Sequence, residues 1–472
     1  MRLWRCALVA LVACHGKDEP PPAPGPAPAS RPRPAPAPAP EFPEGTRSLQ
    51  LVRTVGVRLE PGDDAKRIGT VAIDTRVGWT RSAPGKGCDK SWIEIAPRGW
   101  ICGDYVVPSK QPPYGQEVPH LDRGEIVPGT YGKITVAGAS TYELEKPDKD
   151  KKKKRGAKPA PEPKDPHMVE DSPVIGSLNV RRYDEITVGG KVYWKISQKD
   201  NEYVLKSTIT KHVPSGFGGT RLGDDTGVRV PIAFVWPRGG MSEAYTLAKP
   251  TGGALRTLAV RTPVPVLEVA AGKDGKPTAY RIGDAEWIAA PDVRVFEPEA
   301  PPALLQPGER WIDIDLDSQI LVAFEGDLAV YATLVSSGGK DTPTETGLYR
   351  MWLKESEADM KGLNGEDPYS VATVPWTQFF SPEKGLALHT AYWHDGFGHP
   401  RSHGCVNLAP RDARWLYFWS DPQVPPGWTM AAGVVEAPGS LVRIRSAADP
   451  TPEAKGYAKK VQEQREQNAP PG

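Results

Sequence analysis

The sequence has almost no surplus of either charge and few cysteines or histidines, and each shortage excludes a class of function. Its 472 residues contain 59 Lys and Arg against 58 Asp and Glu, which gives a net charge of +1 at pH 7. Binding to nucleic acid requires a basic field over the phosphates, so we expect no nucleic-acid partner. The His and Cys residues show no clustered ligand spacing, so the sequence predicts no metal site and no cofactor.

Long apolar runs are also scarce. Met1–Ala13 has two early arginines and then a short apolar stretch, which is the shape of a secretory signal and too short for a stable membrane span. Leu11-Val12-Ala13-Cys14 resembles the lipobox of bacterial lipoproteins, which implies cleavage before Cys14 and its lipidation. An ordinary signal peptide that happens to contain a cysteine is the alternative. We expect a lipid-anchored protein at the periplasmic face of the cell envelope, and His15 after the cysteine favours the outer membrane.

Proline and glycine are abundant instead, at 52 and 48 residues, and they mark the domain boundaries. Residues 14–47 form a Pro/Ala-rich linker, which we expect to be extended polyproline II that cannot bury a core. A shorter linker covers residues 298–309. A run of five basic residues within 148–164 is expected to be a solvated loop, with contact to an anionic polymer or lipid head groups as the alternative.

A degenerate repeat occupies most of the chain between the two linkers. A short alternating strand, a tight turn, an aromatic-led strand and a terminal β segment recur over residues 92–107, 193–209 and 279–293. This pattern resembles bacterial SH3-like domains, which implies three small β-barrels at residues 48–110, 115–212 (with the Lys-rich insertion) and 225–297. The implied role is binding to the cell wall or to peptides, and a rigid stack of spacer barrels is an equal alternative.

Cys88 and Cys102 flank a strand-like segment and a turn in the first of these repeats. If the protein is exported, this arrangement favours a disulfide, because disulfides persist in oxidising compartments. Two buried thiols are the alternative.

The sequence pattern changes at residue 310. From there to residue 446 we expect a domain of β-strands, because apolar and polar residues alternate with a period of two. Strands are predicted over 311–316, 319–324, 328–336, 386–389, 428–435 and 441–444, and a turn at 342–347 leads into another strand. A helix is predicted to start near Pro410. Residues 447–472 are expected to be a polar, loose tail.

Cys405 is the cysteine left without a structural role. A thiol attacks as the thiolate, so it needs a neighbouring base or a positive field. His389 and His403 precede it, and Gly404 allows a tight backbone turn whose amides can point at a developing oxyanion. The start of the predicted helix also favours negative charge nearby. These features favour a catalytic cysteine over a buried, inert one.

Two segments carry a specific resemblance. Leu388-His389-Thr390 together with Ser402-His403-Gly404-Cys405-Val406-Asn407 resembles the signature of L,D-transpeptidases with a YkuD-type catalytic domain. The resemblance covers residues 311–445 and implies a β-sandwich with a short helix after the nucleophile, so that we expect a mainly β protein. Twelve residues separate His389 from Ser402, which suggests a short loop there and leaves the substrate preference open.

The resemblance also implies roles for individual residues. Cys405 would be the nucleophile and His389 its general base, with the carbonyl of Thr390 orienting the ring. The amides of Gly404 and Cys405, with His403 nearby, would form the oxyanion hole; for His403 a structural hydrogen bond is an equal alternative. The supporting residues would be Ser402 and Asn407 in the loop and Tyr392 and Trp393 at the donor groove, where core packing is the alternative for both aromatics.

The implied reaction is attack of Cys405 on the third residue of a peptidoglycan tetrapeptide stem, with loss of the terminal D-alanine. An amine of a second stem would complete a 3→3 cross-link, water would make the protein an L,D-carboxypeptidase, and a protein amine would make it an anchoring enzyme. A papain-like wall amidase is disfavoured because its cysteine precedes its histidine, whereas no histidine follows Cys405. A wall-binding lipoprotein with an inactive domain remains open, and the sequence indicates no oligomeric state.

Overall fold

The computed structural model describes residues 42–145, 166–223, 225–362 and 369–468. The predicted signal and Cys14, most of the first linker and the predicted Lys-rich insertion lie outside these ranges. The prediction of a mainly β protein is confirmed. Within the described ranges, no helix combines the length and the apolar character needed to cross a bilayer.

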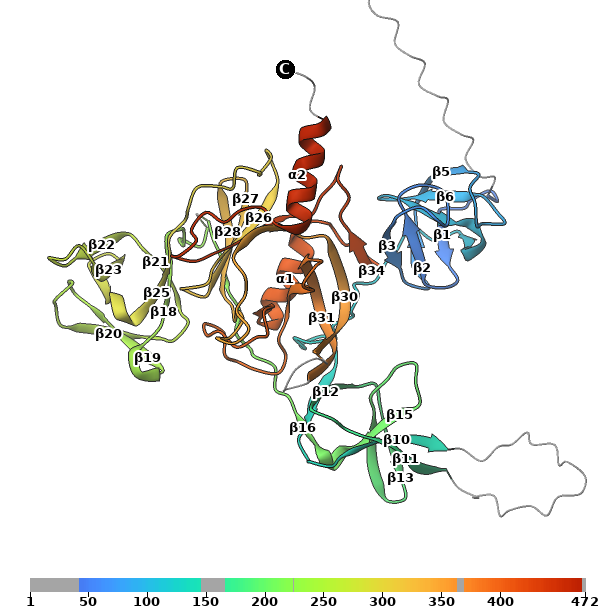
Figure 1. The fold of residues 1–472 in the computed structure, drawn as a ribbon, viewed down its shortest axis with the longest axis horizontal. Coiled ribbons are helices and arrows are strands. Elements are labelled where there is room, and N and C mark those ends of the chain that lie inside the picture. The colour runs from blue at the N-terminus through green and yellow to red at the C-terminus, as the bar shows by residue number, and fades with distance from the viewer. Residues whose placement is uncertain (1–41, 146–165, 224, 363–368, 469–472) are drawn as a thin grey trace, which may run out of the picture.

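Three small β units precede the C-terminal domain (Figure 1). The strands of the first are β1 (Ser48–Leu51), β2 (Val55–Arg58), β3 (Arg67–Val71), β4 (Arg76–Val77), β5 (Trp79–Ala83), β6 (Trp92–Ile95), β7 (Trp100–Cys102) and β8 (Val106–Ser109). Those of the second are β9 (Thr130–Ile134), β10 (Ser140–Glu145), β11 (His167–Pro173), β12 (Ser177–Arg182), β13 (Asp184–Val188), β14 (Lys191–Lys195), β15 (Glu202–Leu205) and β16 (Ile209–Lys211). Those of the third are β18 (Ile232–Val235), β19 (Glu243–Leu247), β20 (Ala254–Ala259), β21 (Pro263–Pro265), β22 (Glu268–Ala271), β23 (Pro277–Gly283), β24 (Glu286–Ala289) and β25 (Val293–Phe296).

The repeated sequence pattern has a repeated structure. In each unit two antiparallel strands are followed by one turn of 3-10 helix and a final strand; the turns are Gly103–Tyr105, Lys206–Thr208 and Ala290–Asp292. In the first unit a disulfide joins Cys88 to Cys102. The Asp104 carboxylate lies beside both sulfurs, 3.7 Å from that of Cys88 and 3.1 Å from that of Cys102. Because the two sulfurs are bonded to each other, neither is a thiolate that could bind a metal ion.

The C-terminal domain contains two sheets with a helix between them. One is six-stranded, in the order β17 (Thr220–Arg221), β28 (Leu328–Leu334), β27 (Ile320–Glu325), β26 (Arg310–Asp315), β35 (Leu441–Arg445) and β29 (Gly347–Arg350). The other contains β34 (Trp428–Ala432), β30 (Leu353–Gly362), β31 (Tyr369–Ser381), β32 (Leu386–Thr390) and β33 (Val406–Leu408). Helix α1 (Pro410–Trp419) contacts β31 and β32 and buries Ala413, Leu416 and Tyr417, as amphipathic spacing predicts.

The C-terminal tail is not loose throughout. Gly456–Asn468 forms helix α2, which contacts β29 and β31. Its apolar residues are few, but Ala458 and Val461 fall three apart on one face and are buried. Arg465 adds an ion pair to Glu309 at the start of the domain. The low apolar content of the segment hid this helix in the sequence.

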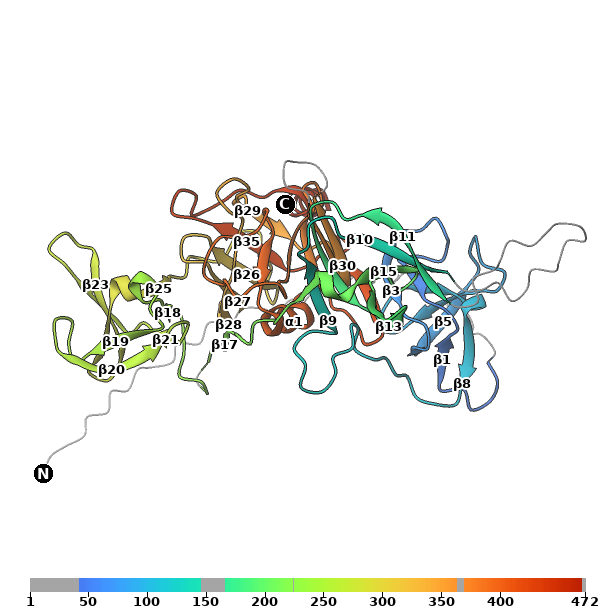
Figure 2. The same ribbon diagram turned by 90° about the horizontal axis from the view of Figure 1, so that it is seen from below.

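Two of the small units extend a sheet of the C-terminal domain. Strand β3 of the first unit pairs antiparallel with β34, and β12 of the second unit pairs in parallel with β31. Strands from three parts of the chain thus form one continuous hydrogen-bonded sheet. The third unit lies on the far side of the domain from the first, as both views show (Figures 1 and 2).

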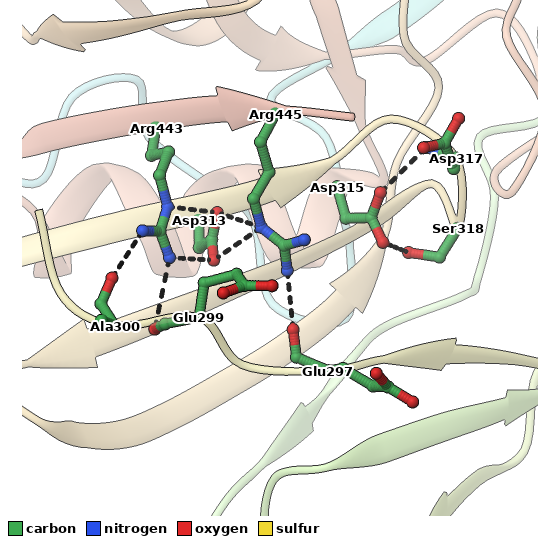
Figure 3. Close-up of polar contacts among 9 residues, drawn as sticks. All are labelled: Glu297, Glu299, Ala300, Asp313, Asp315, Asp317, Ser318, Arg443 and Arg445. Atoms are coloured by element: carbon green, nitrogen blue, oxygen red, sulfur yellow. Dashed lines mark hydrogen bonds and ion pairs between the residues drawn. The ribbon is translucent and has the colours of Figure 1, made fainter. Parts of the chain in front are cut away.

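The junction between the third unit and the C-terminal domain is fixed by a buried carboxylate. Asp313 on β26 is fully buried and pairs with the guanidinium groups of Arg443 and Arg445 on β35 (Figure 3). The two arginines also donate to the carbonyls of Ala300 and Glu297, at 2.6 and 2.8 Å. The carboxylate therefore organises the linker between the two domains as well as the sheet.

Candidate active site

A cavity of about 240 Å³ is lined by six of the residues that the sequence singled out. The lining residues from that set are His389, Trp393, Ser402, His403, Cys405 and Asn407. His389 lies on β32 and Asn407 on β33, and the other four lie in the segment between these strands. The two strands pair in parallel, with His389 opposite Asn407 and Leu388 opposite Val406. Cys405 directly precedes β33 and lies two residues before Asn407, so this register points the thiol and the imidazole to the same face of the sheet.

Cys405 is a free, half-buried thiol. Burial raises the pKa of this thiol, and a hydrogen bond from the backbone of Ala387 acts in the opposite direction. The thiol is therefore protonated near neutral pH, and attack requires a base that removes its proton.

His389 is buried and has the form that a base needs. Its Nδ1 donates a hydrogen bond of 3.0 Å to the carbonyl oxygen of Thr390, so the lone pair is on Nε2. Burial lowers the pKa of His389 to about 4, and the bond to Thr390 opposes this shift. The ring is therefore neutral over the physiological range and can accept the thiol proton.

This protonation state gives a direct prediction. Because burial lowers the pKa of His389, its proton is lost as the pH rises through about 4, far below an ordinary histidine. Nitrogen-15 shifts of histidine-labelled protein should report a neutral, Nδ1-protonated ring from pH 8 down to about pH 5, assigned by its loss in His389→Asn. A midpoint near 6.5, or an Nε2-protonated ring, would contradict the assignment of His389 as a neutral base.

The turn before the nucleophile depends on Gly404, whose φ of +113° is one that residues with a side chain rarely adopt. The Gly404 amide donates to the hydroxyl of Ser402 at 3.1 Å, and that hydroxyl donates to the carbonyl of Cys405. The amide of Gly404 is thus engaged within its own loop, which differs from its predicted place in the oxyanion hole. The side chain of Ser402 holds the turn through these two hydrogen bonds.

A second loop, residues 336–344, holds the nucleophile segment in place. Ser336 and Asn407 exchange backbone hydrogen bonds of 3.0 and 2.9 Å. The Thr344 hydroxyl donates to the Gly404 carbonyl at 2.7 Å and accepts from the amide of Gly338 at 2.8 Å. Sequence reasoning placed Thr344 only in a turn, and its hydrogen bonds show why a hydroxyl is needed there.

Tyr392 and Trp393, the aromatic residues after His389, differ in their surroundings: one is packed in the core and the other lines the cavity. Tyr392 is fully buried and stacks on Tyr131 of the second unit with ring centroids 3.9 Å apart, so it is a core residue. Trp393 is half-buried and lines the cavity. His394 follows Trp393 and is half-buried, and its Nε2 lies 3.0 Å from Nδ2 of Asn407.

Part of the cavity wall comes from residues that sequence reasoning missed. They are Lys133, Ser177, Asn179 and His212 of the second unit, together with Met360, Val371 and Arg401. No local motif marks the first four, because they reach the cavity only through the docking of one unit on another.

One protein-family model matches the part of the chain that contains this site. A family model described as the L,D-transpeptidase catalytic domain, YkuD, matches residues 309–444. L,D-transpeptidase 2 of Mycobacterium tuberculosis is 34% identical over 96 residues, which are 19% of this chain and 23% of that protein. The chain thus matches less than a quarter of the length of this curated relative.

Solved structures match other shares of the chain. A mutant L,D-transpeptidase of Enterococcus faecium is 25% identical, covers 29% of this chain and 50% of its own, and has a TM-score of 0.24. An L,D-transpeptidase of Mycobacterium smegmatis is 16% identical, with 50% and 90% covered and a TM-score of 0.24. The family match spans both the His389 and the Cys405 segments, so the part of the chain that holds the site, residues 309–444, is similar to the L,D-transpeptidase catalytic domain of the YkuD family.

Proposed function

We propose that the protein is a cysteine-dependent peptidoglycan L,D-transpeptidase that forms 3→3 cross-links between stem peptides. The observation that carries the proposal is the Nδ1–Thr390 hydrogen bond of His389, which leaves Nε2 free to act as a base in the cavity that holds the Cys405 thiol. The family of the catalytic domain supports the substrate class.

The proposed reaction has two balanced steps. Nε2 of His389 takes the thiol proton as Cys405 Sγ bonds to the carbonyl carbon of the third stem residue. The peptide bond to D-alanine breaks, and the same proton goes to the leaving amine. An amine of a second stem then attacks the thioester carbonyl carbon and gives a proton to His389. The new amide forms as the bond between that carbon and Cys405 Sγ breaks, and His389 returns the proton to the sulfur. The Cys405 amide and His403 are the proposed donors to the oxyanion.

We also propose the surroundings in which this reaction occurs. A secretory signal and lipidation of Cys14 would place the protein at the periplasmic face of the envelope, anchored to the outer membrane. The three small units would be SH3-like domains, and their role as wall-binding modules is part of the proposal. Mass spectrometry of the mature N-terminus tests the anchor, and an unmodified residue there rejects it.

Incubation of the purified chain with a tetrapeptide stem tests the activity. The expected products are free D-alanine and a dimer joined through the third residues of two stems. D-alanine release without the dimer would assign water as the acceptor and an L,D-carboxypeptidase. Absence of both products would reject the proposed enzyme.

A further inference from the structure

The wall of the catalytic cavity is built in part by a different domain. β31 of the catalytic domain pairs with β12 of the second unit, with Val371 opposite Asn179. On either side of this junction, Asn179 lies opposite Lys133 on β9, and Val371 lies opposite Met360 on β30. Residues opposite one another in neighbouring strands point to the same face of a sheet. Lys133, Asn179, Val371 and Met360 therefore form a row across two domains, and all four line the cavity with Cys405.

The interface that holds this wall is well packed. Tyr131 and Tyr392 stack within a buried cluster that both domains contribute to. Arg181 of the second unit pairs with Glu357 on β30, and the Tyr183 hydroxyl lies 3.0 Å from that of Thr373 on β31. Backbone pairing, buried aromatics and an ion pair thus fix the second unit, so that its cavity residues have defined positions.

The polar groups of this wall have distinct states. His212 Nε2 donates to the Asn179 side-chain oxygen at 2.8 Å, which orients the amide at the junction. Burial and the nearby Lys133 ammonium lower the pKa of His212 to about 4, so the imidazole is neutral near pH 7. Within the described ranges no salt bridge uses Lys133, which is exposed. Lys133 is accordingly the positive charge that the second unit presents to the cavity.

Among the described residues, the charged side chains that line the cavity are all positive. Its lining contains Lys133 and Arg401 but no Asp or Glu among the residues that the structure describes. The chain as a whole has nearly equal numbers of acidic and basic residues, so this lining does not reflect the composition. Cations without carboxylates in a partly enclosed cavity attract an anionic ligand.

We propose that Lys133, placed by docking of the second unit, binds a free carboxylate of the acyl-donor peptide and so determines which peptides reach Cys405. The inference rests on the proposed function for the identity of the peptide. A tetrapeptide stem ends in the carboxylate of the leaving D-alanine, and further carboxylates lie elsewhere on the stem. In either case the group bound is a peptide carboxylate, and the experiment below distinguishes the carboxylate of D-alanine from the others on the stem.

Binding is measured separately from turnover. In the full chain with Cys405→Ala, the Kd of a tetrapeptide stem is determined by calorimetry with and without Lys133→Gln. We expect binding to weaken by roughly 10-fold, as for loss of a charge-assisted contact, and Lys133→Arg to restore most of it. The matched control is Lys211→Gln on β16, because Lys211 lies opposite Gly132, one residue from Lys133, and points to the other face of the sheet. This variant should bind as tightly as the parent.

Two modified peptides identify the carboxylate. If Lys133 binds the leaving D-alanine, a C-terminally amidated tetrapeptide binds more weakly and becomes insensitive to Lys133→Gln. If it binds another carboxylate, the peptide with its remaining carboxylates amidated shows that behaviour instead. The inference would be overturned if Lys133→Gln had no effect on binding. It would also be overturned if Lys133→Gln weakened the binding of both amidated peptides and of the unmodified tetrapeptide equally.

The outcome also separates the inference from the proposed function. Lys133-dependent binding without D-alanine release by the Cys405 protein would leave the inference standing and reject the enzyme. Turnover with a KM that is unchanged in Lys133→Gln would support the enzyme and reject the inference about Lys133. Failure to bind the stem at all would reject the inference whatever the turnover.

Discussion

Replacing His389 with alanine is expected to lower the rate of Cys405 acylation by roughly 10²–10⁴-fold at pH 7. Burial raises the pKa of the Cys405 thiol, so the thiolate is scarce without a base. The neutral ring of His389, with its Nδ1 held by the Thr390 carbonyl, supplies that base. The measurement is single-turnover acylation by a stem peptide or a carbapenem, followed by intact mass.

The pH dependence distinguishes loss of a base from loss of structure. In the parent, the rate should be insensitive to protonation of His389 until the pH falls toward about 4. In His389→Ala the residual rate should climb with pH as solvent hydroxide ionises the thiol. His399→Ala is the control, because His399 is exposed in the same loop and its ring lies 5.0 Å from that of Trp236 in the third unit. An acylation rate in His389→Ala within a few-fold of the control would contradict the assigned role.

Replacing Asp313 with alanine should lower the free energy of unfolding of the catalytic domain by about 3–5 kcal/mol. The substitution leaves the guanidinium groups of Arg443 and Arg445 buried without their shared carboxylate. Both arginines are at most 7% exposed, so water cannot replace the lost partner easily. The linker carbonyls that these arginines hold, Glu297 and Ala300, would also lose an ordered donor (Figure 3).

Hydrogen exchange of the peptides that span β26 and β35 measures this effect locally, which suits a chain of several domains. Asp315→Ala is the matched control on the same strand. Asp315 is half-buried and accepts from the Ser318 hydroxyl at 2.8 Å and the Asp317 amide at 3.0 Å, so its loss should cost about 1 kcal/mol. Equal effects of the two substitutions would show that the buried ion pairs of Asp313 with Arg443 and Arg445 stabilise the domain no more than an ordinary hydrogen-bonded carboxylate does.

The sequence was most informative where the signal is local. Period-two alternation and turn residues predicted the catalytic-domain strands that became β26, β27, β28 and β35, and Pro410 marked the first residue of α1. The long strands β30 and β31 were missed. Thr373 and Trp376 on β31 have positive φ, and the register between the two strands shifts between Ala358 and Met360, so the regular alternation of side chains is interrupted.

For the site, short motifs identified the reactive pair but not the cavity. His389 and Cys405 are recognisable because each lies in a short motif, Leu388-His389-Thr390 and Ser402 to Asn407, that can be read directly from the sequence. Lys133 and Asn179 lie in strands without a distinctive sequence motif, and they line the cavity because β12 pairs with β31. Edge-to-edge strand pairing depends on exposed backbone groups, which every strand has, so side-chain patterns do not predict it. The sequence could suggest small β units, therefore, but not that one of them forms part of the cavity wall.

The most direct test of the central claim is the mass of the intact chain during reaction with a tetrapeptide stem. The account predicts a covalent adduct equal to the stem without its D-alanine, located on Cys405 by peptide mapping and absent in Cys405→Ala. Release of D-alanine with no adduct on Cys405, or an equal adduct in Cys405→Ala, would contradict it.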